Sequence, residues 1–141
     1  MATLRVYDLN NQFLTFDLKD LLRLLEPRSL EAHWVVCAVK DSEPGHEWFE
    51  AIGDGGKQLM ELAEVNAQLS GSALAALAEN TRQVIWGEFI GSGPLQPDEA
   101  WVTIRAIDSS FYEIETEDET VLRKISSTFK DVRSGKAQAR A

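Results

Sequence analysis

Cysteine and long apolar runs are almost absent from this sequence. The single cysteine, Cys37, cannot form a disulfide within the chain, and a lone cysteine in an apolar stretch is typical of a reducing compartment. No stretch approaches the roughly 20 apolar residues that span a bilayer, and the opening residues MATLRVYD contain no apolar signal segment. We therefore predict a cytoplasmic protein that does not enter a membrane.

Basic residues are few. The chain has 14 Lys and Arg against 23 Asp and Glu, a formal net charge of −9. Only Arg133, Lys136 and Arg140 are charged after Val132, so residues 1–132 carry 11 basic and 23 acidic groups, a net charge of −12. Phosphate backbones and anionic membrane surfaces repel such a charge, so we expect neither nucleic acid nor a membrane as partner. A basic protein is the partner that this charge attracts.

Histidine, a common catalytic base and metal ligand, occurs only at His33 and His46. A nucleophilic site needs an oriented base beside a serine, cysteine or threonine, and no such pattern is present, so we predict no catalytic residue. His33 and Cys37 lie four apart in a predicted strand, which separates them by about 13 Å and is too far to share an ion. We therefore predict no metal site and no cofactor, which favours a non-enzymatic protein without excluding an enzyme.

A glycine-rich stretch, 53–57, leads from a predicted strand into a predicted helix. Backbone amides in this setting can bind phosphate. The stretch lacks the Walker spacing and has no hydroxyl residue after Lys57. A flexible turn is therefore the favoured interpretation.

Residues 101–116 contain the clearest structural pattern. Side chains at 102, 104 and 106 are apolar, and they alternate with Trp101, Thr103 and Arg105. Residues 108–110 favour a tight turn, and 111–116 alternate again. The pattern predicts a β-hairpin with one core face and one partly wet face.

A helix is predicted directly after this hairpin. Thr116 and Glu119 have the spacing of a capping box. In this motif the threonine hydroxyl accepts a hydrogen bond from a backbone amide of the first turn, and the glutamate side chain accepts one from the threonine N–H. An apolar stripe then continues at helical spacing as far as Val132. We expect this stripe to pack on the apolar face of the hairpin.

Strand and helix patterns also alternate through the rest of the chain. A hairpin over 3–16 turns at Asn10 and Asn11, and Asp17 caps a helix that Pro27 ends. The later elements are a strand over 32–39, apolar on both faces and therefore the candidate central strand; a strand over 47–52; two short helices within 57–81, separated at 70–72; a strand over 82–90; and a loop over 91–99. Gly87, in mid-strand, predicts a bulge or a close approach to the backbone.

Together these elements predict the α+β class, with a mostly antiparallel sheet of five to seven strands and three to four helices packed on it. We expect one domain over residues 1–133 and a flexible C-terminal tail over 134–141.

The predicted partner-binding residues combine aromatic and acidic side chains on strands: Trp86, Glu88, Trp101, Glu113 and Glu115. Aromatic rings supply rigid contact area, and carboxylates steer a basic partner. We therefore predict a non-enzymatic intracellular protein-binding domain with an acidic surface, of which an immunity or inhibitor protein for a basic partner is one form. The competing interpretation is that the tryptophans are core residues and the acids only keep the protein soluble.

Two further functions fit the same sequence. One is a small-molecule-binding or catalytic domain, with a pocket between helices and sheet that opens near Trp86, Gly87 and the 91–99 loop and contains Glu88 and Arg105. The other is a dimeric structural or accessory protein, a homodimer that pairs through strand 32–39 or an exposed sheet edge.

Overall fold

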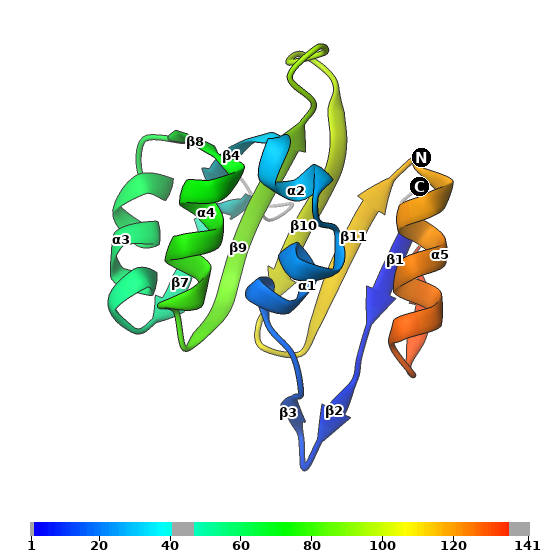
Figure 1. The fold of residues 1–141 in the computed structure, drawn as a ribbon. Helices are drawn as coiled ribbons and strands as arrows, with labels where there is room; N and C mark the ends of the chain where they lie inside the picture. Colours follow the sequence, from blue (N-terminus) through cyan, green and yellow to red (C-terminus); the bar gives the residue numbers. More distant parts are fainter. Residues whose placement is uncertain (1, 41–46, 136–141) are drawn as a thin grey trace.

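The computed structural model describes residues 2–40 and 47–135, and within these ranges its main sheet has eight strands (Figure 1). The strand order is β12-β1-β11-β10-β9-β4-β8, and β7 pairs with the N-terminal part of β9. The pairings in this sheet are antiparallel.

The strands have these bounds: β1 Ala2–Val6, β2 Leu9–Asn10, β3 Phe13–Leu14, β4 His33–Cys37, β5 Val39–Lys40, β6 Glu47–Trp48, β7 Glu50–Ile52, β8 Gln68–Ser70, β9 Gln83–Ser92, β10 Ala100–Ile107, β11 Phe111–Thr116 and β12 Val132–Ser134. The helices are α1 Leu18–Leu24, α2 Arg28–Glu31, α3 Asp54–Ala63, α4 Gly71–Glu79 and α5 Glu119–Thr128.

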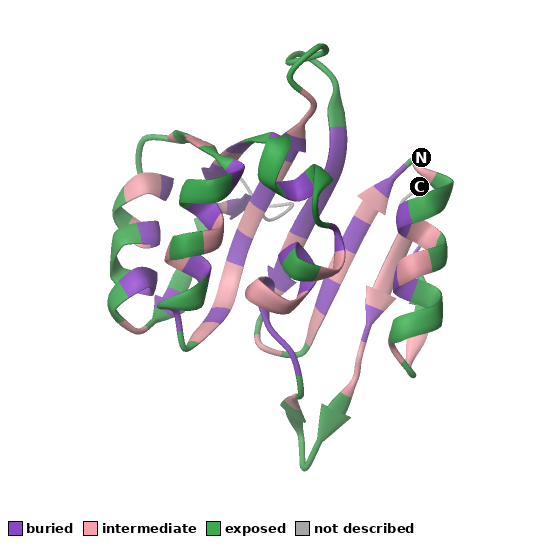
Figure 2. Ribbon diagram, viewed as in Figure 1, coloured by how far each residue is buried: buried purple, intermediate pink, exposed green. Residues whose placement is uncertain are grey.

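The helices lie on one side of the main sheet. Helices α1, α2, α4 and α5 cover one face, and α3 packs beside α4 and against β4 and β7 (Figure 1). Buried and partly buried residues alternate along β11, along β9 from Gly87 and along β10 from Ile104 (Figure 2), so one face of each strand is core. The fully buried Phe89, Ile104 and Ile114 of the sheet belong to the same core cluster as Leu21 and Ile125 of the helices. Burial of each such side chain stabilises the fold by about 1.5–3 kcal/mol.

The predicted α+β class with a mostly antiparallel sheet is confirmed. In the described ranges the main sheet has eight strands rather than five to seven, and five helices rather than three or four pack with it. β8 and β12, which are three residues long, and α2, which has four, were not predicted from the sequence. Elements this short contain too few residues to show a period.

Strand 32–39 is confirmed as a strand but not as the central one. β4 pairs with β9 on one side and with the short β8 on the other, so it lies next to the edge of the sheet. The middle of the strand order is β10. β4 is apolar on both faces because Trp34 and Val36 point into the core while Val35 and Cys37, on the other face, are still half-buried.

The first hairpin forms with its turn one residue later than predicted. β2 pairs with β3, and Asn11 and Gln12 adopt positive φ of 54° and 72°. The segment before it belongs to the main sheet as β1. Asp17 is the N-cap of α1, as predicted, and its N–H donates to Asp20 Oδ2 at 2.8 Å.

Helix α5 begins two residues later than the predicted capping box places it. Its N-cap is Asp118, whose Oδ1 accepts a hydrogen bond from the first turn of the helix. Thr116 stays in β11, opposite Val102 of β10 and Ala2 of β1, and its Oγ1 donates to Trp101 O at 2.6 Å. The capping box at Thr116 is therefore wrong, because strand pairing on both sides holds this residue in extended backbone.

The chain returns to the sheet after α5. The helix ends at Thr128, and Val132, predicted as the end of its stripe, lies in β12 beside β1. Gly135 N donates to Thr3 O at 2.8 Å. The predicted boundary between domain and tail, after residue 133, thus falls inside β12, and residues 136–141 of the predicted tail lie outside the described residues.

Candidate functional site

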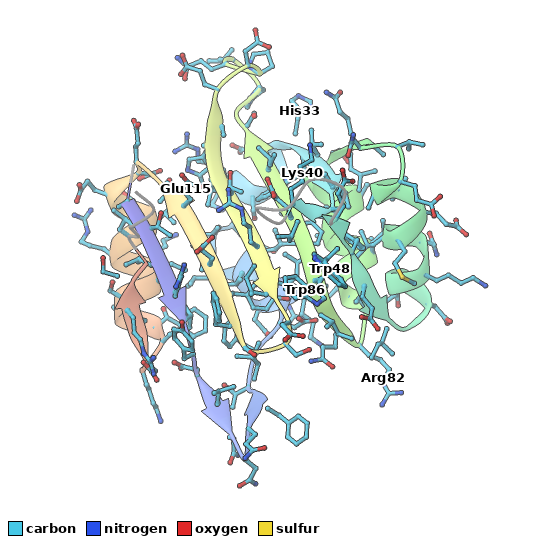
Figure 3. All side chains as sticks on the ribbon, turned by 180° about the vertical axis from the view of Figure 1, so that it is seen from behind. His33, Lys40, Trp48, Arg82, Trp86 and Glu115 are labelled. Carbon is cyan, nitrogen blue, oxygen red and sulfur yellow. The ribbon has the colours of Figure 1, made fainter. Side chains whose placement is uncertain are left out.

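In the described part of the chain, no helix lies over the second face of β1, β11, β10 and β9 (Figure 3). We call this surface the open face. Strand alternation and pairing register place on it the side chains of Thr3, Arg5, Trp86, Glu88, Ile90, Thr103, Arg105, Ile107, Phe111, Glu113 and Glu115. Four of the five predicted partner-binding residues therefore share one surface.

Five charged side chains form a row across the open face, which we call the ionic row. Arg5 Nε lies 3.0 Å from Glu113 Oε2, and Arg105 Nη1 lies 3.0 Å from Glu113 Oε1. Arg105 also contacts Glu115 Oε1 at 3.0 Å and Glu88 Oε1 at 3.5 Å. The pairing register aligns this row, because Arg5 lies opposite Glu113, and Arg105 lies opposite both Glu113 and Glu88.

The carboxylates of the ionic row are largely neutralised within the protein. Burial alone lowers the pKa of Arg105, but the charges of Glu88, Glu115 and Glu113 and a hydrogen bond to Glu115 outweigh it and raise that pKa, so the guanidinium stays charged. Three carboxylates face two guanidinium groups, which leaves one net negative charge. The open face is therefore less acidic than the sequence analysis expected.

Arg5 and Arg105 were not among the predicted partner-binding residues, although Arg105 was named with Glu88 in the alternative pocket and the sequence contains a signal for its position. A turn over residues 108–110 fixes the register of the hairpin, so that Arg105 must lie opposite Glu113 and Thr103 opposite Glu115. Arg5 comes from β1, more than 100 residues away, and no local pattern links it to this row.

Aromatic side chains lie along the same face, beside the ionic row. The rings of Trp86 and Trp48 stack with centroids 5.5 Å apart, and Trp48 is 45% exposed. Tyr7 and Phe111 form a second pair, with centroids 4.8 Å apart, and Arg5 lies over the ring of Phe111. These two pairs lie at opposite sides of the open face and give it rigid apolar area next to fixed charges.

Trp101 does not join the other predicted residues. A register shift between Ala100 and Val102 takes Trp101 out of the strand's alternation, and the side chain turns to the helix-covered side, where it is only 8% exposed. Its ring meets Trp34 edge-on, with centroids 6.4 Å apart. The expectation that Trp101 shares a face with Thr103 and Arg105 is therefore wrong, because a bulge breaks the alternation.

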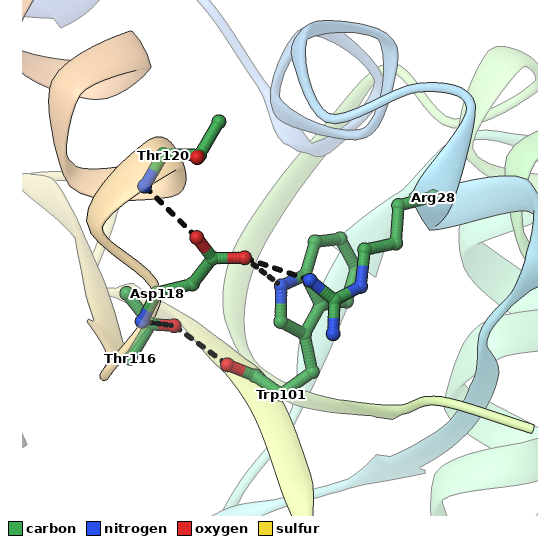
Figure 4. Close-up of polar contacts among 5 residues, drawn as sticks. All are labelled: Arg28, Trp101, Thr116, Asp118 and Thr120. Carbon is green, nitrogen blue, oxygen red and sulfur yellow. Dashed lines mark hydrogen bonds and ion pairs between the residues drawn. The ribbon is translucent and has the colours of Figure 1, made fainter. Parts of the chain in front are cut away.

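A compact polar cluster surrounds Trp101 (Figure 4). Its Nε1 donates to Asp118 Oδ2 at 2.9 Å, and Arg28 Nη1 donates to the same oxygen at 2.8 Å. The Arg28 guanidinium lies over the indole, 4.5 Å from the ring centre. Burial raises the pKa of Asp118, but hydrogen bonds from Trp101 and Thr120 and the charge of Arg28 outweigh it and lower that pKa.

Two surface hollows adjoin this cluster. The larger, about 280 Å³, is lined by loop residues Gly93, Gln96 and Glu99 and by Glu117. The smaller, about 170 Å³, lies between the α1–α2 connection and α5. Trp101, Arg28 and Asp118 line both.

Among the described residues outside these clusters, Asp17 is the most buried carboxylate. It accepts hydrogen bonds from the Tyr112 hydroxyl and from Val84 N. Burial raises the pKa of Asp17, and these hydrogen bonds oppose the rise without cancelling it. The carboxylate borders a hollow of about 300 Å³ that Lys19 and Arg82 also line.

At Gly87, where the mouth of a small-molecule pocket was predicted, aromatic side chains pack closely against the backbone. A Cβ at this glycine would lie 2.8 Å from Phe49 Cε2 and 3.2 Å from the Phe89 ring. Gly87 is therefore a place of close approach, as predicted, and it pairs regularly with Ala106 rather than forming a bulge. The loop is shorter than the predicted 91–99 because β9 extends to Ser92, and its residues Gly93, Gln96 and Glu99 border a hollow at Trp101 instead of one at Trp86.

The histidines and the cysteine were the remaining candidates for a metal or nucleophilic site. His33 and Cys37 lie at the two ends of β4, and burial, with the charge of Glu88, raises the pKa of Cys37 to about 11. His46 lies outside the described residues. Among residues 2–40 and 47–135, no three His, Cys, Asp or Glu side chains are grouped to hold a metal ion.

The glycine-rich stretch, 53–57, leads into α3. Gly55 and Gly56 lie in the first turn of this helix, where backbone at the end of α4 and in β7 passes too close for a Cβ. Packing therefore accounts for both glycines.

Comparisons of the chain with protein-family models, curated proteins and solved structures found no match. None of the helices in the described ranges combines the length and the apolar character needed to cross a membrane.

Proposed function

We propose that this protein is a non-enzymatic protein-binding domain whose open face receives a basic protein partner. The observation that carries the proposal is a sheet face without helices that presents a row of fixed charges beside stacked, partly exposed aromatic rings. Aromatic and arginine side chains dominate the binding energy of protein interfaces when they are held rigidly. An immunity or inhibitor protein for a basic partner remains one form of this function.

Attraction and anchoring come from different parts of the protein in this proposal. The net charge of −9 belongs to the whole chain and increases the rate at which a basic partner arrives. The ionic row, with one net negative charge, supplies directional hydrogen bonds. Trp86 and Trp48 supply the contact area, because their stacked rings lose little conformational freedom when a partner binds.

The two alternative functions have less structural support. A homodimer through strand 32–39 requires an unpaired edge, and β4 has a strand on each side. The edge strands of the main sheet, β8 and β12, have three residues each, a length that discourages edge pairing. For a small-molecule site, the described residues offer the surface hollows beside Trp101 and Asp17. The free thiol of Cys37 supports a cytoplasmic location.

Affinity capture from the source cell with three baits tests the proposal. The baits are the wild-type chain, Trp86→Ala, and a control, Glu61→Gln with Glu64→Gln, which removes two exposed carboxylates on α3 and at its C-cap, outside the open face. A basic protein should bind the wild type and the control, and its affinity for Trp86→Ala should fall about tenfold or more.

Salt dependence of the same complex separates steering from contact. The association rate should fall as salt rises, while the dissociation rate responds mainly to Trp86→Ala. An acidic partner, or a complex that Trp86→Ala and the control weaken equally, would contradict the proposal.

A further inference from the structure

Arg28 contacts Trp101 and Asp118, and both of these residues are held in position by other contacts. Asp118 Oδ2 accepts from Trp101 Nε1 at 2.9 Å, and Oδ1 of the same carboxylate accepts from Thr120 N at 2.8 Å. Trp101 is further held by its edge-on contact with Trp34. The indole and the carboxylate would therefore keep their positions if Arg28 moved away (Figure 4).

The side chain of Arg28 borders both hollows beside this cluster. It lines the larger hollow, with the 93–99 loop and Glu117, and also the smaller hollow against α5. A side chain that enters the larger hollow from outside therefore reaches the indole and carboxylate at the point where Arg28 lies.

Charge selects the kind of group that fits. The larger hollow is lined by the carboxylates of Glu99, Glu117 and Asp118, and Arg28 is its only basic lining residue in the described part of the chain. Without Arg28 the lining would have three acidic groups, so an anionic ligand would be repelled and a cation attracted. A cation over the face of an indole gains further attraction from the ring.

Arg28 is held in a way that permits exchange. Its side chain is 54% exposed, and it donates to one oxygen of Asp118 rather than to both. Water and salt screen an ion pair of this exposure, so it contributes little to the stability of the fold. An external group that makes the same contacts can replace it without opening the core.

We propose that this cluster is a binding site for the guanidinium group of an arginine side chain from another molecule, which takes the place of Arg28 on Trp101 and Asp118. A guanidinium suits the site better than an ammonium because its planar group stacks on an indole while its N–H groups bond a carboxylate. The site shares no residue with the open face, so this proposal and the proposed function can fail separately.

Titration with a short peptide, acetyl-Gly-Arg-Gly-amide, tests the proposal. The Trp101 indole N–H resonance, assigned with Trp101→Phe, reports binding because this group donates to Asp118. Arg28→Ala should bind the peptide about tenfold or more tightly than the wild type, because the wild-type site is mostly occupied by its own arginine. The matched control is Arg23→Ala, which removes another half-exposed, ion-paired arginine from α1 and should leave the affinity unchanged.

Three further comparisons test the chemistry. The peptide with citrulline in place of arginine keeps the shape without the charge and should not bind Arg28→Ala, and the lysine peptide should bind more weakly than the arginine peptide. Adding Asp118→Asn to Arg28→Ala keeps a side chain able to cap α5 and should abolish binding. The proposal would be overturned by equal affinity of wild type and Arg28→Ala, by equal binding of the citrulline and arginine peptides, or by full binding after Asp118→Asn. A thermal melt of each variant confirms that it is folded.

Discussion

Asp17, the N-cap of α1, and Arg105 of β10 lie on opposite sides of the main sheet. Their charges are compensated in different ways. On the helix-covered face, Asp17 is 9% exposed and accepts hydrogen bonds from neutral groups, the Tyr112 hydroxyl and Val84 N. On the open face, Arg105 contacts charged groups, including the carboxylates of Glu113 and Glu115. One charge is held by oriented dipoles in the core, and the other by opposite charges in a row that water still reaches.

The difference predicts which substitutions affect stability and which affect the proposed binding. A buried group whose donors are fixed loses all of them at once when it is changed, and water cannot replace them. A member of the ionic row loses one partner of several, and water solvates what remains. Substitutions on the covered face should therefore affect unfolding, whereas those on the open face should affect binding.

Adjacent residues of β9 give the sharpest test of this comparison. Phe89 is fully buried under the helices, and Ile90 lies on the open face. Phe89→Ala should lower the free energy of unfolding by about 3–5 kcal/mol, since it leaves a cavity between Phe49 and Gly87. Ile90→Ala should cost about 1 kcal/mol, because its side chain is already partly solvated. Urea unfolding measures both, and equal losses would contradict the comparison.

The charged groups should show the same asymmetry on a smaller scale. Asp17→Ala leaves the Tyr112 hydroxyl and Val84 N without their acceptor and should lower the free energy of unfolding by about 2–4 kcal/mol. Glu115→Ala leaves Arg105 with Glu113 and Glu88 and should cost less than about 1 kcal/mol. A larger loss for Glu115→Ala than for Asp17→Ala in urea unfolding would reverse the assignment of the two faces.

The pH dependence of stability should have opposite signs for Asp17 and a surface carboxylate. Burial raises the pKa of Asp17, so the folded state binds its proton more tightly and the contribution of Asp17 to stability falls as pH rises above 3.8. A hydrogen bond from Arg133 lowers the pKa of the exposed Asp131, whose contribution is lost as pH falls through its folded pKa. The free energy of unfolding of Asp17→Asn and of Asp131→Asn is measured at pH values on both sides of 3.8, and the wild-type value is subtracted. The two differences should change with pH in opposite directions, and slopes of the same sign would count against this prediction.

The smallest expected effect concerns Cys37, which lies beside the ionic row. Burial first, and the charge of Glu88 second, raise its pKa to about 11, so thiol labelling should be slow at neutral pH and accelerate toward that value. Glu88→Gln removes only the second cause and should accelerate labelling of the folded protein about two- to fivefold at neutral pH. An unchanged rate would show that Glu88 does not act on this thiol.

The long elements of the fold were predictable because each repeats its pattern several times. The alternation over 101–116, with a turn at 108–110, gives the hairpin β10–β11 and the register that places Arg105 opposite Glu113. Asp17 was recognisable as a cap because helix initiation is local. Four of the five predicted partner-binding residues share the open face for the same reason: strand alternation fixes their side.

The features that were missed depend on contacts between distant segments. Trp101 leaves the alternation only because its strand bulges against β9, and no residue type at this position signals that shift. Val132 has the spacing of a helix residue but pairs in β12, since an unpaired β1 edge lies beside it. Asp118 rather than Thr116 caps α5 because β1 and β10 hold Thr116 between them.

Charge, periodicity and turn residues act locally and leave their pattern in the chain, so an acidic α+β protein with a mostly antiparallel sheet could be predicted from the residues alone. The pairing of the open-face carboxylates with Arg5 and Arg105, and the position of Trp101 under Arg28 on the other side, became evident only in the folded chain. Those arrangements depend on which strands become neighbours and where a strand bulges. Such choices are made by the burial of the whole core rather than by any one segment.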